Sequence, residues 1–126
     1  MSKIITKKMI KDYEELGVVY IPKLFKNHIN NLKKGIEFNL NNPGPYAAEN
    51  LHKKENGRFF DDYCNWERIP EFRKTIFDSE IIAAAAQLMQ SQSVQLFHDH
   101  VLVKEPGTSK DTPWHSDGPY YFVNGK

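Results

Sequence analysis

The chain has 126 residues, of which 40% are hydrophobic and 13% aromatic, and this suffices for a single domain with a modest core. Its 17 basic and 16 acidic residues give a net charge of +1, so neither nucleic acid nor an anionic membrane surface is expected as a partner. The single cysteine, Cys64, excludes an intrachain disulfide framework. The N-terminus lacks the apolar core of a secretory signal, and no apolar run is long enough to cross a bilayer. We therefore expect a cytoplasmic protein.

Residues 1–92 are predicted to be mainly helical. Apolar residues at three- and four-residue spacing indicate four helices, over residues 7–16, 27–40, 70–77 and 80–90. Thr6 suits the cap of the first helix, and Gly17 suits its end. Pro70 suits the first position of the third helix, and Ser79 suits the cap of the fourth. The fourth helix is expected to bury a stripe made of Ile81, Ile82, Ala85, Leu88 and Met89.

Strands are expected where β-branched and aromatic residues gather between turn residues. The predicted strands cover residues 18–21, 58–60, 93–104, 114–117 and 120–123. Pro22 ends the first of them, because proline cannot continue a strand. The polar stretch 43–57 is predicted to be a surface loop, and residues 61–67 a helical turn. A β-rich core therefore begins at about residue 93.

The segment 112–121, Thr-Pro-Trp-His-Ser-Asp-Gly-Pro-Tyr-Tyr, holds the pairing of an imidazole with a carboxylate that is best suited to a metal. Side chains alternate along an extended strand, so His115 and Asp117 are expected to point to the same side. A histidine and a carboxylate match two of the three ligands of the facial triad of non-haem Fe(II) oxygenases. A bare His-x-Asp is common, however, and its ordinary interpretation is a polar surface strand.

His98 and His100 lie two residues apart on the predicted strand 93–104, so both are expected to project from the same face as Leu102 and Lys104. The alternating set Phe97, Val101 and Val103 is more apolar and would normally face the interior. The histidine face either lines a cofactor pocket or meets water. A direct metal ligand, a contact to the cofactor and a solvated pair all remain open for these histidines. A zinc site for hydrolysis, made of His98, His100, His115 and Asp117, is the weakest alternative, because structural zinc usually binds thiolates.

The segments 97–108, Phe-His-Asp-His-Val-Leu-Val-Lys-Glu-Pro-Gly-Thr, and 112–121 together resemble the phytanoyl-CoA dioxygenase family of iron- and 2-oxoglutarate-dependent oxygenases. The resemblance implies that His115 and Asp117 bind Fe(II), that 2-oxoglutarate is the cosubstrate, and that a small molecule or acyl thioester is hydroxylated. It also implies cosubstrate contacts for His100 and Arg58.

Two further side chains are candidates for the cofactor pocket. Lys104 is suited to balance the charge of a dicarboxylate, although a lysine at the end of a strand is usually solvated. Trp114 is suited either to wall the iron pocket or to pack in the core.

The resemblance implies an α+β fold, with N-terminal helices packed on the beginning of a double-stranded β-helix, a jelly roll of the cupin type, that starts in residues 93–126. Asn124-Gly125 after an apolar strand indicates a hairpin, yet no return strand follows. We therefore expect the N-terminal part of one longer domain, without the distal His and Arg of the family and with little turnover alone. An uncovered edge strand also predicts self-association. The alternative is a non-catalytic short relative that binds a ligand or a partner.

Overall fold

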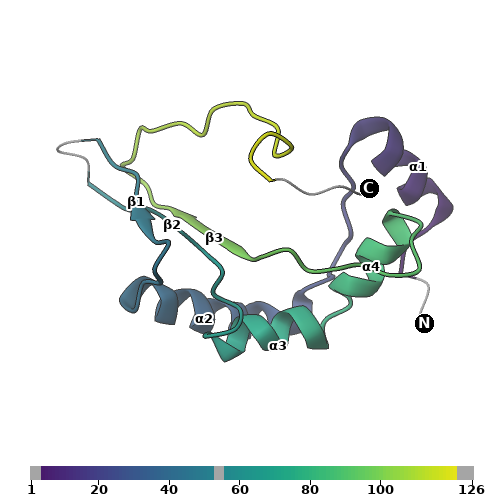
Figure 1. Ribbon diagram of the computed structural model, residues 1–126, viewed down its shortest axis with the longest axis horizontal. Helices are drawn as coiled ribbons and strands as arrows, with labels where there is room; N and C mark the ends of the chain where they lie inside the picture. The colour runs from purple at the N-terminus through teal and green to yellow at the C-terminus, as the bar shows by residue number, and fades with distance from the viewer. Residues whose placement is uncertain (1–3, 53–55, 122–126) are drawn as a thin grey trace.

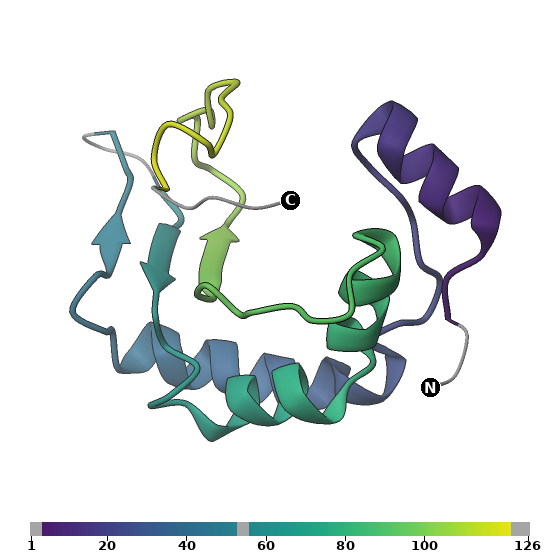
Figure 2. The ribbon, with the colours of Figure 1, turned by 45° about the vertical axis from the view of Figure 1, so that its right-hand side comes forward.

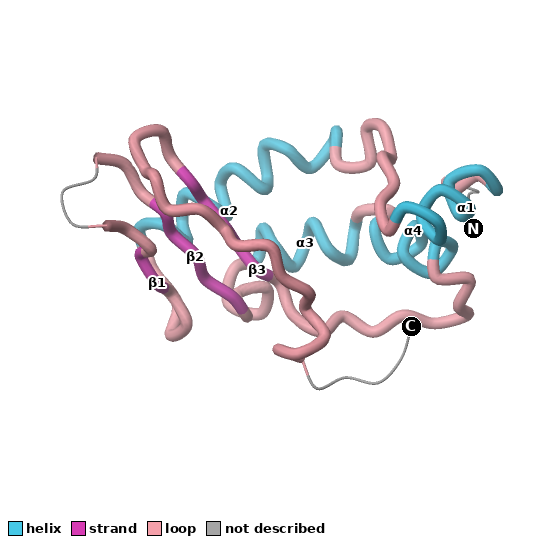
Figure 3. The backbone as a smooth tube through the Cα atoms, turned by 90° about the horizontal axis from the view of Figure 1, so that it is seen from above, coloured by secondary structure: helices cyan, strands magenta, loops and turns pink. Residues whose placement is uncertain are grey.

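A computed structural model describes residues 4–52 and 56–121, and it shows four α-helices and one antiparallel sheet, in agreement with the predicted α+β class (Figure 1). Two helices, α2 (Ile29–Asn41) and α3 (Pro70–Asp78), lie side by side beneath the sheet (Figure 3). The other two, α1 (Lys7–Leu16) and α4 (Ile81–Leu88), pack together at the opposite end of the molecule (Figure 2). In these two described ranges, no helix has the length and apolar character needed to cross a membrane.

The helix ends follow the signals in the sequence. Thr6 Oγ1 accepts a hydrogen bond of 3.1 Å from the Met9 amide, and Gly17 ends α1 with a left-handed φ of 70°. The predicted cap of α4 is displaced by one residue, because Glu80 and not Ser79 is at the cap position, although Ser79 Oγ lies 3.3 Å from the Ile81 amide. The predicted buried stripe of α4 is wrong, because Ala84 alone is buried in this helix and Ile82 is 39% exposed. The reason is the position of α4 at the end of the molecule, where it packs against α1 and α3 rather than within a central core.

The sheet has the order β1-β2-β3, and both pairs of strands are antiparallel. The strands are β1 (Ala48–Glu49), β2 (Phe59–Tyr63) and β3 (His100–Lys104). Phe60 lies opposite Val103 in the register of β2 and β3. The sheet thus takes β1 and β2 from the part of the chain predicted to be mainly helical, and β3 from the part predicted to begin the jelly roll.

Several strand predictions need correction. The predicted strand 18–21 does not form, because this segment lies away from the sheet and Tyr20 is 80% exposed. Strand β1 falls in the predicted loop 43–57, and β2 extends into the predicted helical turn. Of the segment 93–104, only the last five residues pair, since β2 turns away at Cys64, which has a φ of 63°.

The C-terminal strand predictions also differ from the structure. Residues 114–117 form no strand, and Tyr120 lies in a turn. The remainder of the predicted strand 120–123, apart from Tyr121, and the Asn124-Gly125 hairpin lie outside the described residues.

The buried apolar side chains fall in three places. Phe60, Ile69 and Phe72 are buried in the part of the molecule that contains the sheet, α2 and α3, Phe59 is buried on the pocket face of the sheet, and Ile5 and Ala84 are buried at the end formed by α1 and α4. Gly35 of α2 lets α3 approach closely, because a Cβ at this position would lie 2.6 Å from the ring of Phe72. This close approach packs α2 directly against α3.

A buried carboxylate joins the sheet to α2. Asp62 is 0% exposed, and its Oδ2 accepts hydrogen bonds of 2.7 Å from Asn39 Nδ2 and of 2.7 Å from the Gly44 amide. Arg68 places a guanidinium nitrogen 3.5 Å from the same oxygen. Burial opposes ionisation, but the hydrogen bonds from Asn39 and Gly44 and the charge of Arg68 outweigh it, so the pKa of Asp62 is lowered. The ionised carboxylate therefore stabilises the contact between sheet and helix.

Candidate functional site

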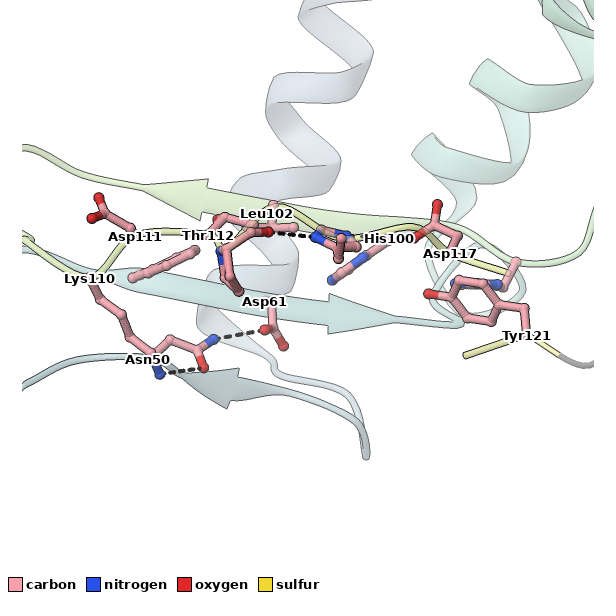
Figure 4. A pocket seen from close by; sticks show the side chains of 13 residues that line it. Asn50, Asp61, His100, Leu102, Lys110, Asp111, Thr112, Asp117 and Tyr121 are labelled. Atoms are coloured by element: carbon pink, nitrogen blue, oxygen red, sulfur yellow. Dashed lines mark hydrogen bonds and ion pairs between the residues drawn. The ribbon is translucent and has the colours of Figure 1, made fainter. Parts of the chain in front are cut away.

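A pocket of about 520 Å³ lies on the face of the sheet opposite the helices (Figure 4). Asp61 and Leu102 form part of its floor and lie opposite each other in the register of β2 and β3. Their neighbours Phe60 and Asp62 point to the helices, as the alternation of a strand requires. Residues of the segment 110–121 form the other wall. The pocket thus lies between a sheet and a loop, and it is open to solvent.

His115 and Asp117 both line this pocket, and the distance from His115 Nε2 to Asp117 Oδ1 is 3.6 Å. The predicted strand does not bring them together. His115 lies in an irregular segment, and Asp117 opens a turn in which its carbonyl oxygen accepts hydrogen bonds from the amides of Tyr120 and Tyr121. A turn, and not a strand, therefore brings His115 and Asp117 together. Among the described residues, no strand of the sheet pairs with either of them.

The imidazole of His115 has a defined orientation. Its Nδ1 lies 2.7 Å from the carbonyl oxygen of Pro113. A carbonyl oxygen can only accept a hydrogen bond, so Nδ1 carries the proton and donates it. The lone pair of the neutral ring then lies on Nε2, the nitrogen that approaches Asp117. Histidines that bind metals are commonly oriented in this way by a backbone carbonyl.

The separation of the two side chains suits a shared ion. Metal–ligand bonds of about 2.1 Å place two ligands of one ion at most about 4.2 Å apart, and Nε2 and Oδ1 are 3.6 Å apart. Both side chains are accessible, with 45% of the His115 side chain and 74% of the Asp117 side chain exposed. An imidazole nitrogen and a carboxylate oxygen also suit Fe(II). This pair of residues therefore fits two positions of an iron site.

His98 and His100 line the same pocket. The ring of His100 stands edge-on to Tyr63 with a centroid distance of 4.7 Å, and the ring of His98 lies 5.1 Å from that of Tyr121. Within residues 4–52 and 56–121, no group of three or more His, Cys, Asp or Glu side chains is arranged to hold a metal ion. The zinc site of four residues is therefore not formed there, and the two histidines act as aromatic walls of the pocket.

Arg58, Lys104 and Trp114 do not line the pocket. Arg58 lies over the ring of Phe60 on the helix side of the sheet, and its Nε donates a hydrogen bond of 2.7 Å to Glu49. Lys104 Nζ is bonded at 2.6 Å to the carbonyl oxygen of Lys110. Trp114 is 104% exposed, so it belongs neither to a pocket wall nor to the core. The structure therefore places three of the four predicted cofactor contacts elsewhere, and His100 alone reaches the pocket.

The sequence interpretation missed five polar residues of the pocket, and three of them contact one another. The five are Asn50, Asp61, Lys110, Asp111 and Thr112. Lys110 Nζ lies 3.4 Å from Asn50 Oδ1, and Asn50 Nδ2 donates a hydrogen bond of 2.7 Å to Asp61 Oδ2. Asn50 directly follows β1, Asp61 lies in β2 and Lys110 comes from the loop after β3. The alternation of Phe59 and Asp61 along β2 was the signal that could have identified Asp61. Asn50 and Lys110 meet because of how the strands pair, and the local sequence pattern does not predict that pairing.

A comparison with known families identifies the chain. The family model of phytanoyl-CoA dioxygenase matches residues 13–125. The chain belongs to the phytanoyl-CoA dioxygenase family. The match confirms the resemblance drawn from the segments 97–108 and 112–121, and it makes the chain a relative of dioxygenases that generally depend on Fe(II) and 2-oxoglutarate. No curated protein and no solved structure matches the chain.

Proposed function

We propose that this member of the phytanoyl-CoA dioxygenase family contributes His115 and Asp117 to the Fe(II) site of a 2-oxoglutarate-dependent oxygenase. The contact between His115 Nδ1 and the Pro113 carbonyl is the observation that carries the proposal, because it presents the Nε2 lone pair 3.6 Å from the Asp117 carboxylate. A facial triad needs a third ligand, and among the described residues no group of three or more His, Cys, Asp or Glu side chains comes together. Iron and 2-oxoglutarate, when bound, supply the oxidising chemistry for the hydroxylation of an unactivated carbon.

The residues of the chain then have defined tasks. The Pro113 carbonyl accepts a hydrogen bond from Nδ1 and so orients the imidazole, and the turn at Asp117 holds the carboxylate beside it. The rings of His98, His100 and Tyr121 wall the pocket and limit the access of water. We further propose that the sheet is the start of a jelly roll, in which another strand pairs with the edge of β3 that β2 leaves free.

The pocket favours a small substrate. Its volume of about 520 Å³ falls within the range of about 300–1,000 Å³ that is usual for small-molecule sites. Aromatic walls at His100 and Tyr121 and an aliphatic floor at Leu102 suit the carbon skeleton of such a molecule. A small molecule, or the acyl end of a thioester, is therefore the proposed substrate.

An anaerobic titration with Co(II), a spectroscopic substitute for Fe(II), tests the metal site. We expect the His115→Ala and Asp117→Ala variants each to bind Co(II) more than about tenfold more weakly, because even residues that only orient a ligand cost about 10–100-fold. His28→Ala and Asp78→Ala remove the same side-chain types at positions outside the pocket and serve as matched controls. Equal affinity in all five proteins would exclude the proposed site.

Ligand binding without turnover is the second candidate function. One observation favours it, namely that residues 4–52 and 56–121 supply two metal ligands but no third. Succinate formation from 2-oxoglutarate, measured in the presence of Fe(II) and oxygen, distinguishes the two. Succinate formation that His115→Ala abolishes supports the oxygenase, whereas metal binding without any succinate supports the binding protein.

A further inference from the structure

The segment 111–120, which carries His115 and Asp117, is loosely attached to the rest of the molecule. All of its residues are exposed, and Trp114 is 104% exposed. Within the described part of the chain, the hydrogen bonds, the ion pair and the ring contact of these residues all join members of the stretch 113–121. The placement of His115 and Asp117 over the sheet therefore depends on the residues that flank the segment.

Tyr121 directly follows the segment and is partly buried. The centroid of its ring lies 5.3 Å from that of Phe97 and 5.1 Å from that of His98. The interplanar angles of 73° and 52° correspond to edge-on and tilted packing, which aromatic rings prefer to a face-to-face sandwich. At the other end of the segment, the carbonyl oxygen of Lys110 accepts a hydrogen bond of 2.6 Å from Lys104 Nζ. The segment is thus held at both ends, and at Tyr121 it is held by a ring.

The two residues that contact the Tyr121 ring are held close to the sheet by their neighbour Asp99. Its Oδ1 accepts hydrogen bonds of 2.9 Å from the Asn65 amide and of 2.8 Å from the Trp66 amide. Its carbonyl oxygen accepts a third, of 3.1 Å, from the amide of Cys64, which follows β2. Three hydrogen bonds therefore fix the backbone against which the Tyr121 ring packs.

The backbone links Tyr121 to Asp117. The amides of Tyr120 and Tyr121 donate hydrogen bonds of 2.9 and 3.2 Å to the carbonyl oxygen of Asp117, and these bonds close the turn. Asp117 and Tyr121 accordingly lie at the same end of the pocket (Figure 4). A displacement of the Tyr121 ring would therefore move the turn, and with it the carboxylate that lies 3.6 Å from His115 Nε2.

We propose that Tyr121 is a positioning residue. Its ring, packed against Phe97 and His98, holds the turn so that the Asp117 carboxylate and the His115 imidazole face one ion. Both contacts are made by the ring, so a phenylalanine should serve equally well at this position. The inference rests on the proposed function, because the turn is taken to present a metal ligand.

An anaerobic Co(II) titration of Tyr121 variants tests this role. We expect Tyr121→Ala to weaken Co(II) binding by about tenfold or more, because residues that orient a metal ligand typically contribute about 10–100-fold. Tyr121→Phe, which keeps the ring, should bind as the wild type does. Tyr20→Ala removes an 80% exposed tyrosine outside the pocket and is the matched control. Phe97→Ala should also weaken binding, and adding it to Tyr121→Ala should cause no further loss, because both changes remove the same contact.

Amide exchange with solvent, measured by NMR on the metal-free protein, tests the anchor without the metal. Tyr121→Ala should speed the exchange of the Tyr120 amide, which closes the turn. The amides of Asn65 and Trp66, which Asp99 binds, should exchange as in the wild type. A tyrosine needed only for the stability of the whole fold would instead change exchange at all three amides, and that result would overturn the proposal.

Three results of the Co(II) titration would also overturn it: equal affinity in Tyr121→Ala and the wild type, the same loss in Tyr20→Ala, or a loss in Tyr121→Phe as large as in Tyr121→Ala. If the wild type itself does not bind Co(II), the oxygenase proposal fails. Faster exchange of the Tyr120 amide in Tyr121→Ala would then still support the anchored turn, and unchanged exchange would refute it.

Discussion

The side chains of β2 point alternately to two different environments, which are the helices on one face of the sheet and the pocket on the other. Phe60 and Asp62 point toward α2 and α3 and are 1% and 0% exposed. The Asp62 carboxylate accepts hydrogen bonds from Asn39 and from the Gly44 amide. Toward the pocket, the facing Leu102 of β3 is 52% exposed, and the opposite wall is a loop. The helix side of β2 is therefore shielded from solvent, whereas the pocket side, apart from the buried Phe59, exposes groups that can contact a ligand.

Replacement of Phe60 by alanine should have the largest effect on stability. Truncating a buried phenylalanine costs about 3–5 kcal/mol, because apolar burial is lost and a cavity remains. Leu102→Ala on the pocket face is the control, and it should cost less than about 1 kcal/mol, since half of that side chain is already in water. Urea unfolding followed by circular dichroism measures both. Similar losses for the two variants would contradict the division between the faces.

Asp62→Ala should have the second largest effect. It should lower the free energy of unfolding by about 3 kcal/mol at neutral pH, because buried donors are left without an acceptor. The adjacent Asp61→Ala on the pocket face is the control and should cost about 1 kcal/mol or less, the contribution of one hydrogen bond. Urea unfolding of the variants and the wild type at neutral pH gives both values. A loss in Asp61→Ala as large as in Asp62→Ala would contradict this assignment.

The stabilisation from Asp62 should depend on pH. Its pKa in the folded state is lowered below the ordinary 3.8, so the carboxylate contributes fully above that pH and loses its contribution as the pH falls toward the folded pKa. The difference in unfolding free energy between the wild type and Asp62→Ala should therefore shrink below pH 3.8. A difference that stays constant across this range in urea titrations would show that ionisation of Asp62 is not involved.

Gly44→Ala should lower the free energy of unfolding by an intermediate amount. A Cβ at this position would lie 2.7 Å from Asn65 Oδ1 and 2.9 Å from Asp62 Oδ2, so the buried network must shift, at a cost of about 1–3 kcal/mol. Gly118 in the pocket loop is the matched position, because nothing lies within 4 Å of its Cβ. Gly118→Ala should change the free energy of unfolding by less than about 0.5 kcal/mol. A larger loss in Gly118→Ala than in Gly44→Ala, measured by thermal unfolding, would contradict the proposed contrast.

The sequence could predict the features that depend on residues close together in the chain. The pairing of His115 with Asp117 is local, so a spacing of two residues was enough to suggest it, although a turn and not a strand forms it. The four helices were also predicted, because their periodicity and caps are local signals. The family match then confirmed the resemblance drawn from these segments.

The parts that could not be predicted depend on residues far apart in the chain. Residues 61–67 were predicted to be a helical turn, yet Asp61 and Asp62 lie in β2, although aspartate is disfavoured in strands. Asn39 and Gly44, which are 23 and 18 residues away from Asp62, compensate for its burial and allow the strand. Likewise, Lys110 meets Asn50 over a separation of 60 residues. Local patterns contain no information about such pairs.

Trp114→Ala should have the smallest effect on stability, although tryptophan is the largest side chain and Trp114 directly precedes His115. Its side chain is 104% exposed, so the substitution should change the free energy of unfolding by less than about 0.5 kcal/mol. Trp66 is the matched control, since it is half-buried, with its ring 5.6 Å from Phe77 and the Arg73 guanidinium 5.3 Å above it. Trp66→Ala should cost about 1–3 kcal/mol, less than a fully buried tryptophan. If urea unfolding showed the larger loss in Trp114→Ala, the segment around His115 and Asp117 would be packed against the fold, and the pocket wall would be as rigid as the helix side.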